Sequence, residues 1–386
     1  MGTLITQCAA CGKKTLSVLM RDGGICSSCA TKAAQEEANR RAQEAKQKAK
    51  QKAEAEEAKR LRAEAIYDKI KKRPSLPQKD NILKNGTLAD AERYLKACNE
   101  IIENLQAAKS NSDFLELYRH LWDSNDLRFP YWNIYYRTEN MPIAYLQHGI
   151  DHYIKEKEYA EEIIEKTMLV KKFALETPRA DIKREPCSYQ PDEDPDFAGL
   201  KLSNVTASSI RMQLADYIVI DVETTGLSPT KDGIVQIAAV KYESYTPIEI
   251  FCTYIKPKGG IKPAAQEINN ITEEMVMDAP TVEEVTNSFR SFIGNSLPLV
   301  GHNIIFDLRF LCAAGCLSII PKRKYYDTLN LAKKAFKDCS TPNFKLDTLL
   351  RRFLYIVRDD AHDALSDCIS TGLLFNSETE LITGES

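Results

Sequence analysis

The stretch that decides the fold of this chain reads Tyr217-Ile218-Val219-Ile220-Asp221-Val222-Glu223-Thr224-Thr225-Gly226. It opens with a short apolar run, which is typical of a buried strand. Side chains two positions apart on a strand point to the same side, so Asp221 and Glu223 are expected to reach together into a crevice at the strand's end. The small residues after them let the backbone come close to a ligand. The stretch therefore predicts a strand that ends in a paired-carboxylate site.

The residues downstream of this stretch show further strand and helix patterns. Strands are predicted at Gly233–Tyr242, Ile248–Ile255 and Leu297–Val300. Helices are predicted at Pro263–Ile268, Thr272–Met277 and Thr281–Ile293, and others begin near Phe306, Thr328, Lys345 and Ala364. Consecutive strands that are followed by alternating helices and strands predict an α/β domain with a mixed sheet and helices on its faces.

Two further carboxylates and a histidine lie where helices are predicted to begin. Asp307 ends the run Gly301-His302-Asn303-Ile304-Ile305-Phe306-Asp307, and His362 and Asp367 form the pattern H-x-x-x-x-D. Carboxylates gathered in one cleft repel one another unless cations lie between them. Two divalent ions would satisfy four carboxylates, and oxygen ligands select hard ions such as Mg²⁺ or Mn²⁺.

Six motifs over about residues 216–376 carry a resemblance to a known family. They are D-V-E-T-T-G-L-S-P, A-P-T-V-E-E-V, G-H-N-I-I-F-D, Y-D-T-L-N-L-A, K-L-D-T-L and H-D-A-L-S-D. In this order they resemble the DEDDh branch of the DEDD exonucleases, and they are similar to the proofreading epsilon subunit of bacterial DNA polymerase III. The resemblance implies an exonuclease domain with a ribonuclease-H-like fold over residues 213–378.

The resemblance also assigns roles to single residues. It implies that two Mg²⁺ or Mn²⁺ ions are held by Asp221, Glu223, Asp307 and Asp367. His362 would deprotonate the attacking water, and nucleoside 5′-monophosphates would leave the 3′ end one at a time. The terminal nucleotide is expected to contact Thr224, Thr225, Gly226, Leu227 and Phe306.

Other polar residues near this site have both a structural and a catalytic interpretation. We expect His302 and Asn303 to hydrogen-bond the loop that positions Asp307, although a catalytic role is the alternative. Asp327 is expected to cap the helix that follows it, with a fifth acid near the metals as the alternative. Asp363 competes with His362 for the role of base, and the spacing to Asp367 favours His362.

The expected substrate is the 3′ end of single-stranded DNA, in proofreading or repair, with a polymerase or another replication or repair protein as a partner. Trimming of RNA 3′ ends is the alternative within the enzyme class, because the 2′-hydroxyl contact that discriminates sugars has no short sequence signature. A non-catalytic adapter that binds nucleic acid or replisome proteins is the alternative outside that class, and the intact acid set argues against it.

Four cysteines near the start of the chain form a metal-type pattern. Cys8, Cys11, Cys26 and Cys29 spell C-x-x-C, fourteen residues, C-x-x-C, and Thr15–Ile25 between them is interpreted as a hairpin with a turn at Gly23-Gly24. Four thiolates make a closed tetrahedral Zn²⁺ site, which is structural because no coordination position stays open. Residues 1–30 are therefore predicted to bind Zn²⁺, with a redox dithiol pair or chance spacing as the alternatives, and they resemble the short zinc ribbons of many multidomain proteins.

Residues 31–73 have neither Gly nor Pro before Pro74 and consist largely of strong helix formers. They hold 14 Lys and Arg against 8 Asp and Glu. A solvated helical spacer is the expected structure, and weak dimerisation as a coiled coil or loose contact with phosphates are the alternatives.

Residues 80–176 have apolar positions at helical spacing and are predicted to form a small helical domain. Its centre holds Tyr118, Trp122, Phe129, Tyr131, Trp132, Tyr135 and Tyr136, interleaved with Arg119, Arg128 and Arg137. We expect these aromatics to fill the helical core, and stacking on bases of a single strand is the alternative. Residues 177–212, rich in Pro and charge, are predicted to be a linker.

Composition sets the outer limits of these interpretations. A chain of 386 residues is expected to hold two or three domains. It lacks an apolar run long enough to span a membrane and a secretory signal, and most of its cysteines are scattered singly, so a cytosolic protein with free thiols is expected. Residues 216–386 hold 17 basic against 23 acidic side chains. An acidic domain that acts on polyanions requires bridging cations.

Overall fold

The computed structural model describes residues 5–16, 20–21, 24–71, 82, 86–117, 141–185, 187, 202–317, 323–359 and 362–384. The chain divides into two compact units. The first comprises Met1–Pro74 and Glu100–Tyr153, and the second comprises Ser75–Asn99 and Ile154–Ser386. Among the described residues, no helix is both long enough and apolar enough to cross a membrane.

The first unit begins with two small antiparallel strand pairs. β1 (Ile5–Gln7) pairs with β2 (Lys14–Leu16), and β3 (Met20–Arg21) pairs with β4 (Ile25–Cys26). The β3–β4 turn contains Gly24 at φ 76°, a conformation that glycine adopts without steric cost. The predicted hairpin is therefore shorter than expected, because Lys14–Leu16 pairs with the strand before Cys8.

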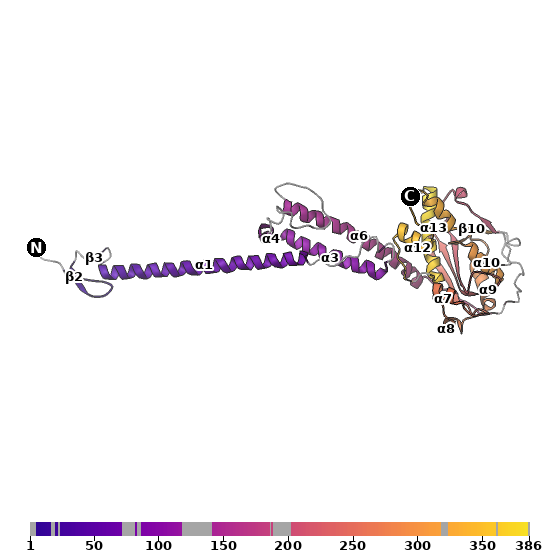
Figure 1. Cartoon of the computed structure of the whole chain (residues 1–386), viewed down its shortest axis with the longest axis horizontal. Coiled ribbons are helices and arrows are strands. Elements are labelled where there is room, and N and C mark those ends of the chain that lie inside the picture. Colours follow the sequence, from indigo (N-terminus) through magenta and orange to yellow (C-terminus); the bar gives the residue numbers. More distant parts are fainter. Residues whose placement is uncertain are drawn as a thin grey trace. The chain divides into compact units, whose positions relative to one another are not determined.

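Helix α1 (Ser27–Lys71) is continuous over 45 residues, as the composition predicts (Figure 1). Ion pairs one turn apart line its exposed surface, for example between Arg41 Nε and Glu37 Oε1 at 2.8 Å. Each such pair adds only about 0.3–0.5 kcal/mol. Near its end the helix packs on α4 (Ser112–Leu117), where Arg62 pairs with Asp113 at 3.4 Å.

Two long helices confirm the helical pattern of the middle region. They are α3 (Leu88–Ser110) and α6 (Met141–Glu176). Tyr94 and Glu156 form a hydrogen bond between them, as do Lys109 and Gln147. The aromatic and arginine cluster over residues 118–137 lies outside the described residues. Base stacking by that cluster, and the domain boundaries 80–176, stay predictions.

The second unit contains a six-stranded mixed sheet, as the strand pattern predicts. Its strands are β5 (Leu202–Asn204), β6 (Tyr217–Thr224), β7 (Ile234–Glu243), β8 (Thr246–Tyr254), β9 (Leu299–Gly301) and β10 (Arg323–Asp327). They lie in the order β5-β10-β9-β6-β7-β8. β7 is antiparallel to both β6 and β8, whereas β9 is parallel to β6 and to β10, and β10 is parallel to β5.

Helices cover both faces of this sheet. They are α7 (Pro263–Asn269), α8 (Glu273–Val276), α9 (Val282–Ile293), α10 (Ile305–Ala313), α11 (Thr328–Ala335), α12 (Leu346–Leu349), a π turn at Leu350–Leu354 and α13 (Ala364–Thr383). Figure 1 shows α13 on one side of the sheet and α9 and α10 on the other. Tyr217 and Val219 of β6 pack in the core under α13, whereas Ile218 and Ile220 pack in the core under α9 and α10. The face under α13 is therefore the face on which Asp221 and Glu223 lie.

The stretch 177–212, interpreted from its composition as a linker, instead contacts both strands and a helix of the second unit where it is described. The N–H of Ile250 donates to Pro178 O at 2.8 Å, and the N–H of Ala180 donates to Ile250 O at 2.7 Å. Further along, Lys183 N donates to Ser288 Oγ at 3.0 Å. Strand β5 then joins β10. Backbone hydrogen bonds hold this stretch together with a few apolar side chains, such as Ile182, Val205 and Ile210. These side chains are spaced too irregularly to give a hydrophobic period.

Candidate active site

Four carboxylates meet at the end of β6. Asp221 and Glu223 extend from β6, and Asp307 and Asp367 lie in the first turns of α10 and α13. Asp307 is only 3% exposed and Asp367 only 9%. The ligand atoms of Glu223, His362 and Asp367 lie within 4.8 Å of one another. The structure thus brings together the carboxylates that the sequence predicts to share one site.

The backbone fixes these carboxylates relative to one another. The N–H of Val222, between the two acids of β6, donates to Asp307 Oδ1 at 2.9 Å. Helix α13 starts at the same end of the sheet and crosses β6 and β7, which places Asp367 above β6. A change in pairing register occurs between Glu223 and Thr224, so the regular ladder of β6 and β7 is interrupted at the site.

Burial and mutual repulsion raise the pKa values of the carboxyl groups in the cluster. Burial, reinforced by Asp367 and Asp307, raises the pKa of Glu223 to about 8. Burial also raises the pKa of Asp307 to about 8, although the hydrogen bond from Val222 opposes the shift. The pKa of Asp221 lies well above its ordinary range, because of burial and the three neighbouring carboxylates. A set of buried oxygen ligands that repel one another fits hard divalent cations.

Arg358 is a site residue that the sequence analysis missed. Its side chain is 3% exposed, and its Nη1 donates to Oδ1 of Asp367. The same guanidinium donates to Asp347 Oδ1, from Nε at 3.1 Å and from Nη2 at 2.5 Å. Burial raises the pKa of Asp367, and the Arg358 charge opposes that shift. Asp347 belongs to the K-L-D-T-L motif, but nothing in the sequence pairs it with Arg358.

His362 and Asp363 have different surroundings although they are neighbours. His362 is exposed, has φ 66° and lies with Glu223 and Asp367. Asp363 caps α13, because its Oδ1 accepts from Ser366 N at 3.0 Å. Its Oδ2 accepts from Gln236 Nε2 at 3.0 Å. Both oxygens of Asp363 are thus engaged in structural hydrogen bonds, and His362 is the residue that faces the cluster.

The loop around His302 is held by hydrogen bonds from side chains and backbone. His302 Nε2 donates to Phe344 O at 3.0 Å, and Nδ1 lies 2.9 Å from Thr328 Oγ1. Burial lowers the pKa of His302 to about 4, so this imidazole is uncharged near neutral pH. The N–H of Asn303 donates to Asp327 Oδ1 at 2.9 Å. These contacts are the loop-holding interactions expected of His302 and Asn303.

Asp327 is a helix cap. Its Oδ1 accepts from Leu329 N at 3.1 Å, at the start of α11. Its Oδ2 accepts from Asn330 Nδ2 at 2.9 Å. The capping interpretation of Asp327 is therefore confirmed.

The predicted substrate-contact residues form a tight turn after β6. The Thr224 hydroxyl donates to Gly226 O at 2.6 Å, and the Thr225 hydroxyl accepts from Gly233 N at 2.9 Å. A Cβ on Gly226 would lie 2.4 Å from the Asp232 carboxylate, so any larger residue there would have to displace the Asp232 side chain. Leu227 next to it is 84% exposed. Phe306 is partly buried and its ring lies 4.9 Å from that of Phe310.

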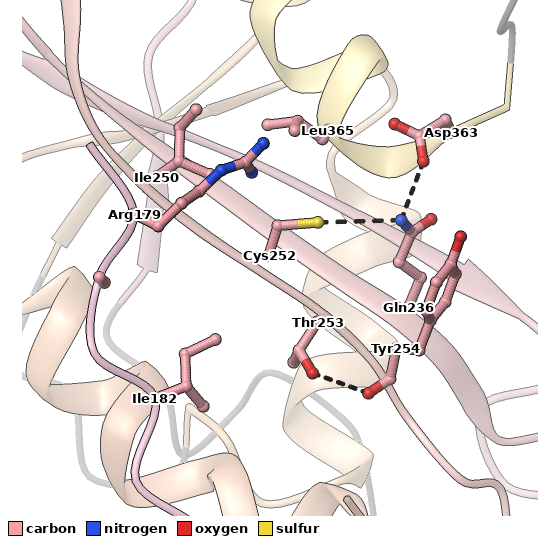
Figure 2. A pocket seen from close by; sticks show the side chains of 10 residues that line it. Arg179, Ile182, Gln236, Ile250, Cys252, Thr253, Tyr254, Asp363 and Leu365 are labelled. Carbon is pink, nitrogen blue, oxygen red and sulfur yellow. Dashed lines mark hydrogen bonds between the residues drawn. The ribbon is translucent and has the colours of Figure 1, made fainter. Parts of the chain in front are cut away.

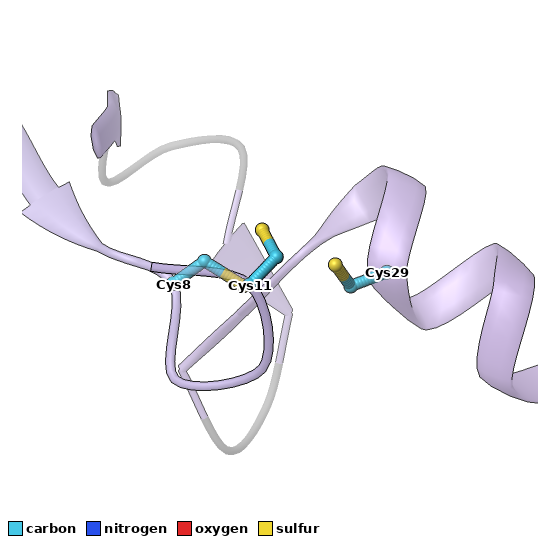
Figure 3. Close-up of side chains that lie close together, drawn as sticks. All are labelled: Cys8, Cys11 and Cys29. Atoms are coloured by element: carbon cyan, nitrogen blue, oxygen red, sulfur yellow. The ribbon is translucent and has the colours of Figure 1, made fainter. Parts of the chain in front are cut away.

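The N-terminal cysteines converge in the first unit. The sulfur atoms of Cys8, Cys11 and Cys29 lie within 4.8 Å of one another (Figure 3). The loop between the first two is a tight turn in which Gly12 N donates to Cys8 O at 2.9 Å. Cys26 lies on β4, and its side chain lies outside the described residues. A group of convergent thiolates fits a tetrahedral Zn²⁺ ion.

Comparisons with known proteins agree with this geometry. The exonuclease family model matches residues 218–375. DNA polymerase III PolC-type of Caldanaerobacter subterraneus subsp. tengcongensis is 34% identical over 172 residues, which is 44% of this chain and 12% of that protein. The Bacillus subtilis protein of the same description is 37% identical over 161 residues, 41% of this chain and 11% of that protein. The chain thus spans about one eighth of the length of these curated relatives.

Solved structures also align with part of the chain. E. coli exonuclease I in complex with a dT13 oligonucleotide aligns with a TM-score of 0.37 and 22% identity, over 42% of this chain and 40% of that chain. Exonuclease X in complex with 5′ overhanging duplex DNA aligns with a TM-score of 0.33 and 25% identity, over 44% of this chain and 94% of that chain. From the family match and the acid set at the end of β6, residues 218–375 are an exonuclease domain of the DEDDh type with a ribonuclease-H-like fold.

Proposed function

We propose that this domain is a metal-dependent 3′-to-5′ exonuclease that releases nucleoside 5′-monophosphates from single-stranded DNA. The observation that carries the proposal is the convergence of Asp221, Glu223, Asp307 and Asp367 with His362 at the end of β6. The carboxylates destabilise one another in the absence of cations, which is the electrostatic condition for a two-metal site.

The four carboxylates are the residues that would hold two Mg²⁺ or Mn²⁺ ions. When bound, such ions acidify a water molecule and stabilise the charge that develops on the leaving 3′ oxygen. Arg358 binds Oδ1 of Asp367, which leaves Oδ2 of that carboxylate for a metal. Asp307 stays oriented by the N–H of Val222. The protein thus orients the Asp307 and Asp367 carboxylates by its own hydrogen bonds.

His362 is the proposed general base. It is exposed at the rim of the cluster, where a ring nitrogen can take the proton of the attacking water. The turn at Thr224–Leu227 is the proposed contact for the terminal nucleotide, with Leu227 presenting an uncovered apolar side chain and Phe306 a further contact. Because the Thr224 and Thr225 hydroxyls are engaged within the turn, they act by shaping it.

We propose DNA rather than RNA as the substrate because of the descriptions of the matching curated proteins. The curated proteins that match this domain are described as DNA polymerase III PolC-type. We therefore propose single-stranded DNA ends as the substrate, a role in proofreading or repair, and a polymerase or another replication or repair protein as a partner. Trimming of RNA 3′ ends is the alternative that the experiment below distinguishes.

The N-terminal cysteines are proposed to hold one structural Zn²⁺ ion. Cys8, Cys11 and Cys29 supply three convergent sulfurs, and Cys26 is the proposed fourth ligand. Because all four ligands are thiolates, the ion would stabilise residues 1–30 and take no part in hydrolysis.

The experiment is a cleavage assay on single-stranded DNA and RNA oligonucleotides that carry a 5′ label, in Mg²⁺, Mn²⁺ or EDTA. We expect a metal-dependent ladder that shortens from the 3′ end, lost in His362→Ala and retained in His152→Ala. His152 is an exposed histidine of α6 and serves as the matched control. Immediate release of a labelled mononucleotide, or cleavage that persists in EDTA, would overturn the proposal. A ladder on RNA alone would favour the RNA-trimming alternative.

A further inference from the structure

The backbone at His362 adopts a conformation that its surroundings must hold. Its φ of 66° lies in the left-handed region, which residues with a Cβ rarely adopt. Such a conformation persists only when neighbouring contacts over-determine it. The contacts that follow His362 directly are therefore the ones that decide where its imidazole points.

One buried side chain supplies two of those contacts. Gln236 of β7 is 3% exposed, and its Nε2 donates to Asp363 Oδ2 at 3.0 Å. Its Oε1 accepts from the N–H of Ala364 at 3.1 Å. Both polar atoms of Gln236 thus hold the two residues after His362. We call this pair of hydrogen bonds the Gln236 clamp.

The Gln236 clamp ties the segment of His362 to the strand next to the one that carries Glu223. In the antiparallel register of β6 and β7, Gln236 lies opposite Glu223. Directly opposed residues point to the same face of a sheet. β7 is hydrogen-bonded to a strand on each side, so it is an interior strand. Glu223 and Gln236, the residue that holds the segment after His362, are therefore direct neighbours on adjacent strands.

The Gln236 clamp borders a cavity on one side. Gln236 and Asp363 line a cavity of about 380 Å³, together with Cys252, Tyr254 and Arg179 (Figure 2). The dashed lines in Figure 2 show Gln236 between Cys252 and Asp363. Because space adjoins Asp363 there, loss of the hydrogen bond from Gln236 would leave the Asp363 side chain, next to His362, with room to shift.

From these contacts we infer that Gln236 is a positioning residue that sets the orientation of His362 for proton transfer. The inference rests on the proposed function, because it assumes that His362 is the general base. Gln236 does not belong to the carboxylate set, and its effect passes through Asp363 and Ala364. Substitution should therefore lower kcat and leave KM and metal binding unchanged.

The test compares Gln236→Met with Tyr242→Phe in the full chain. Methionine keeps the approximate volume of glutamine and removes both hydrogen bonds of the clamp. Tyr242 is the matched control, because it is a buried residue of the same strand whose hydroxyl donates to Ile369 O of the same helix at 3.0 Å. A merely structural role predicts that both variants behave alike.

The expected results separate positioning from stability. General bases contribute about 10²- to 10⁴-fold, so we expect kcat on single-stranded DNA to fall by about 10-fold or more in Gln236→Met. KM, and Mn²⁺ affinity measured by electron paramagnetic resonance, should stay within about twofold, since the carboxylates are untouched. Tyr242→Phe should retain kcat. Asp363→Asn, which keeps the cap and loses one hydrogen bond of the clamp, should give an intermediate kcat.

A double-variant cycle decides whether Gln236 acts through His362. In a His362→Ala background, Gln236→Met should change the residual kcat by less than about twofold, because the group that it positions is gone. Additive losses, or equal kcat in Gln236→Met and Tyr242→Phe, would overturn the inference. A wild-type protein that does not cleave, or an undiminished rate in His362→Ala, would instead contradict the proposed function.

Discussion

Arg358 donates through Nη1 to Oδ1 of Asp367, and the same buried guanidinium holds Asp347 on its other edge. It is thus a cation fixed against one member of the four-carboxylate cluster. Its charge opposes the burial that raises the pKa of Asp367 and also the shift at Asp221. In the absence of metal ions, the positive charge of Arg358 therefore offsets part of the repulsion among the four carboxylates.

Loss of this cation should destabilise the metal-free protein. Removal of one partner of a buried ion pair leaves an uncompensated charge, so Arg358→Met should lower the free energy of unfolding by about 3 kcal/mol in EDTA. Urea denaturation measures the change. Arg352→Met, a neighbouring exposed arginine, is the control and should have an effect below about 0.5 kcal/mol. Equal stabilities for the two variants would show that the Arg358 pairs add nothing.

Asp307→Asn should abolish hydrolysis and leave the domain folded. The amide oxygen of asparagine can still accept from Val222 N, and the substitution removes one charge from a repelling group. Because bound metal contributes several kcal/mol to such reactions, kcat should fall by about 10³-fold or more. Circular dichroism in EDTA checks the fold, and Asp278→Asn, an exposed acid outside the site, should cleave normally. Retained cleavage by Asp307→Asn would remove it from the metal site.

The stability of the metal-free domain should fall as the pH rises. The pKa values of Glu223 and Asp307 are raised from 4.5 and 3.8 to about 8, so the folded state binds these protons more tightly than the unfolded state. Their stabilising contribution is full below about pH 4 and is lost as the pH passes through about 8. The slope is at most about 1.4 kcal/mol per pH unit for each carboxyl.

Denaturation at pH 6, 7, 8 and 9 in EDTA measures this slope. Mg²⁺ should flatten it, because bound cations favour the ionised carboxylates. Asp307→Asn should reduce the slope in EDTA, because one of the titrating groups is gone. Stability that stays level between pH 6 and 9 in the metal-free wild type would contradict the assignment of raised pKa values.

Leu227→Ala should weaken substrate binding without a cost in stability. The side chain is 84% exposed, so its truncation should change the free energy of unfolding by less than about 0.5 kcal/mol. If Leu227 packs on the terminal nucleotide, loss of ~1–2 kcal/mol of apolar contact raises KM about 5- to 30-fold. Leu175→Ala on α6 is the control, because Leu175 is also 84% exposed. An unchanged KM in both variants would exclude Leu227 from the substrate site.

Cys11→Ser should release Zn²⁺ and leave the nuclease active. Loss of one thiolate opens the coordination shell of a structural site, whereas the carboxylate cluster lies in the other compact unit. Zinc content by elemental analysis and cleavage of labelled DNA test the two statements. Cys339→Ser replaces another exposed cysteine and should retain the zinc. Loss of cleavage together with zinc would assign the ion a role in catalysis.

The parts of the domain that the sequence predicts are those with local signals. An apolar run and two acids at i and i+2 are sufficient to predict β6 and the direction of Asp221 and Glu223. Strand β10 lacks such a signal, because its first residue is a buried arginine. The Arg323 guanidinium donates to the carbonyls of Ile293, Gly294 and Leu297, and these partners lie about thirty residues away.

The supporting residues of the site could not be predicted for the same reason. Arg358 has two carboxylates as partners, and many other pairings of the same residue types are equally compatible with the sequence. The Gln236 clamp joins residues 127 and 128 positions apart. The left-handed backbone at His362 has no sequence signal, because only a small fraction of histidines adopt it. Only the folded chain brings these groups together.

The segment that passes along β8 covers part of a strand border that would otherwise be free to pair with another molecule. β8 is a nine-residue strand at one border of the sheet, and the backbone of residues 178–180 occupies part of its free hydrogen-bonding side. An uncovered border strand of that length is a template for pairing with another molecule. A protein that began at Tyr217 would retain the four carboxylates and His362 but would expose this template. A nuclease fragment that stays monomeric should therefore include residues upstream of the strand that carries its chemistry.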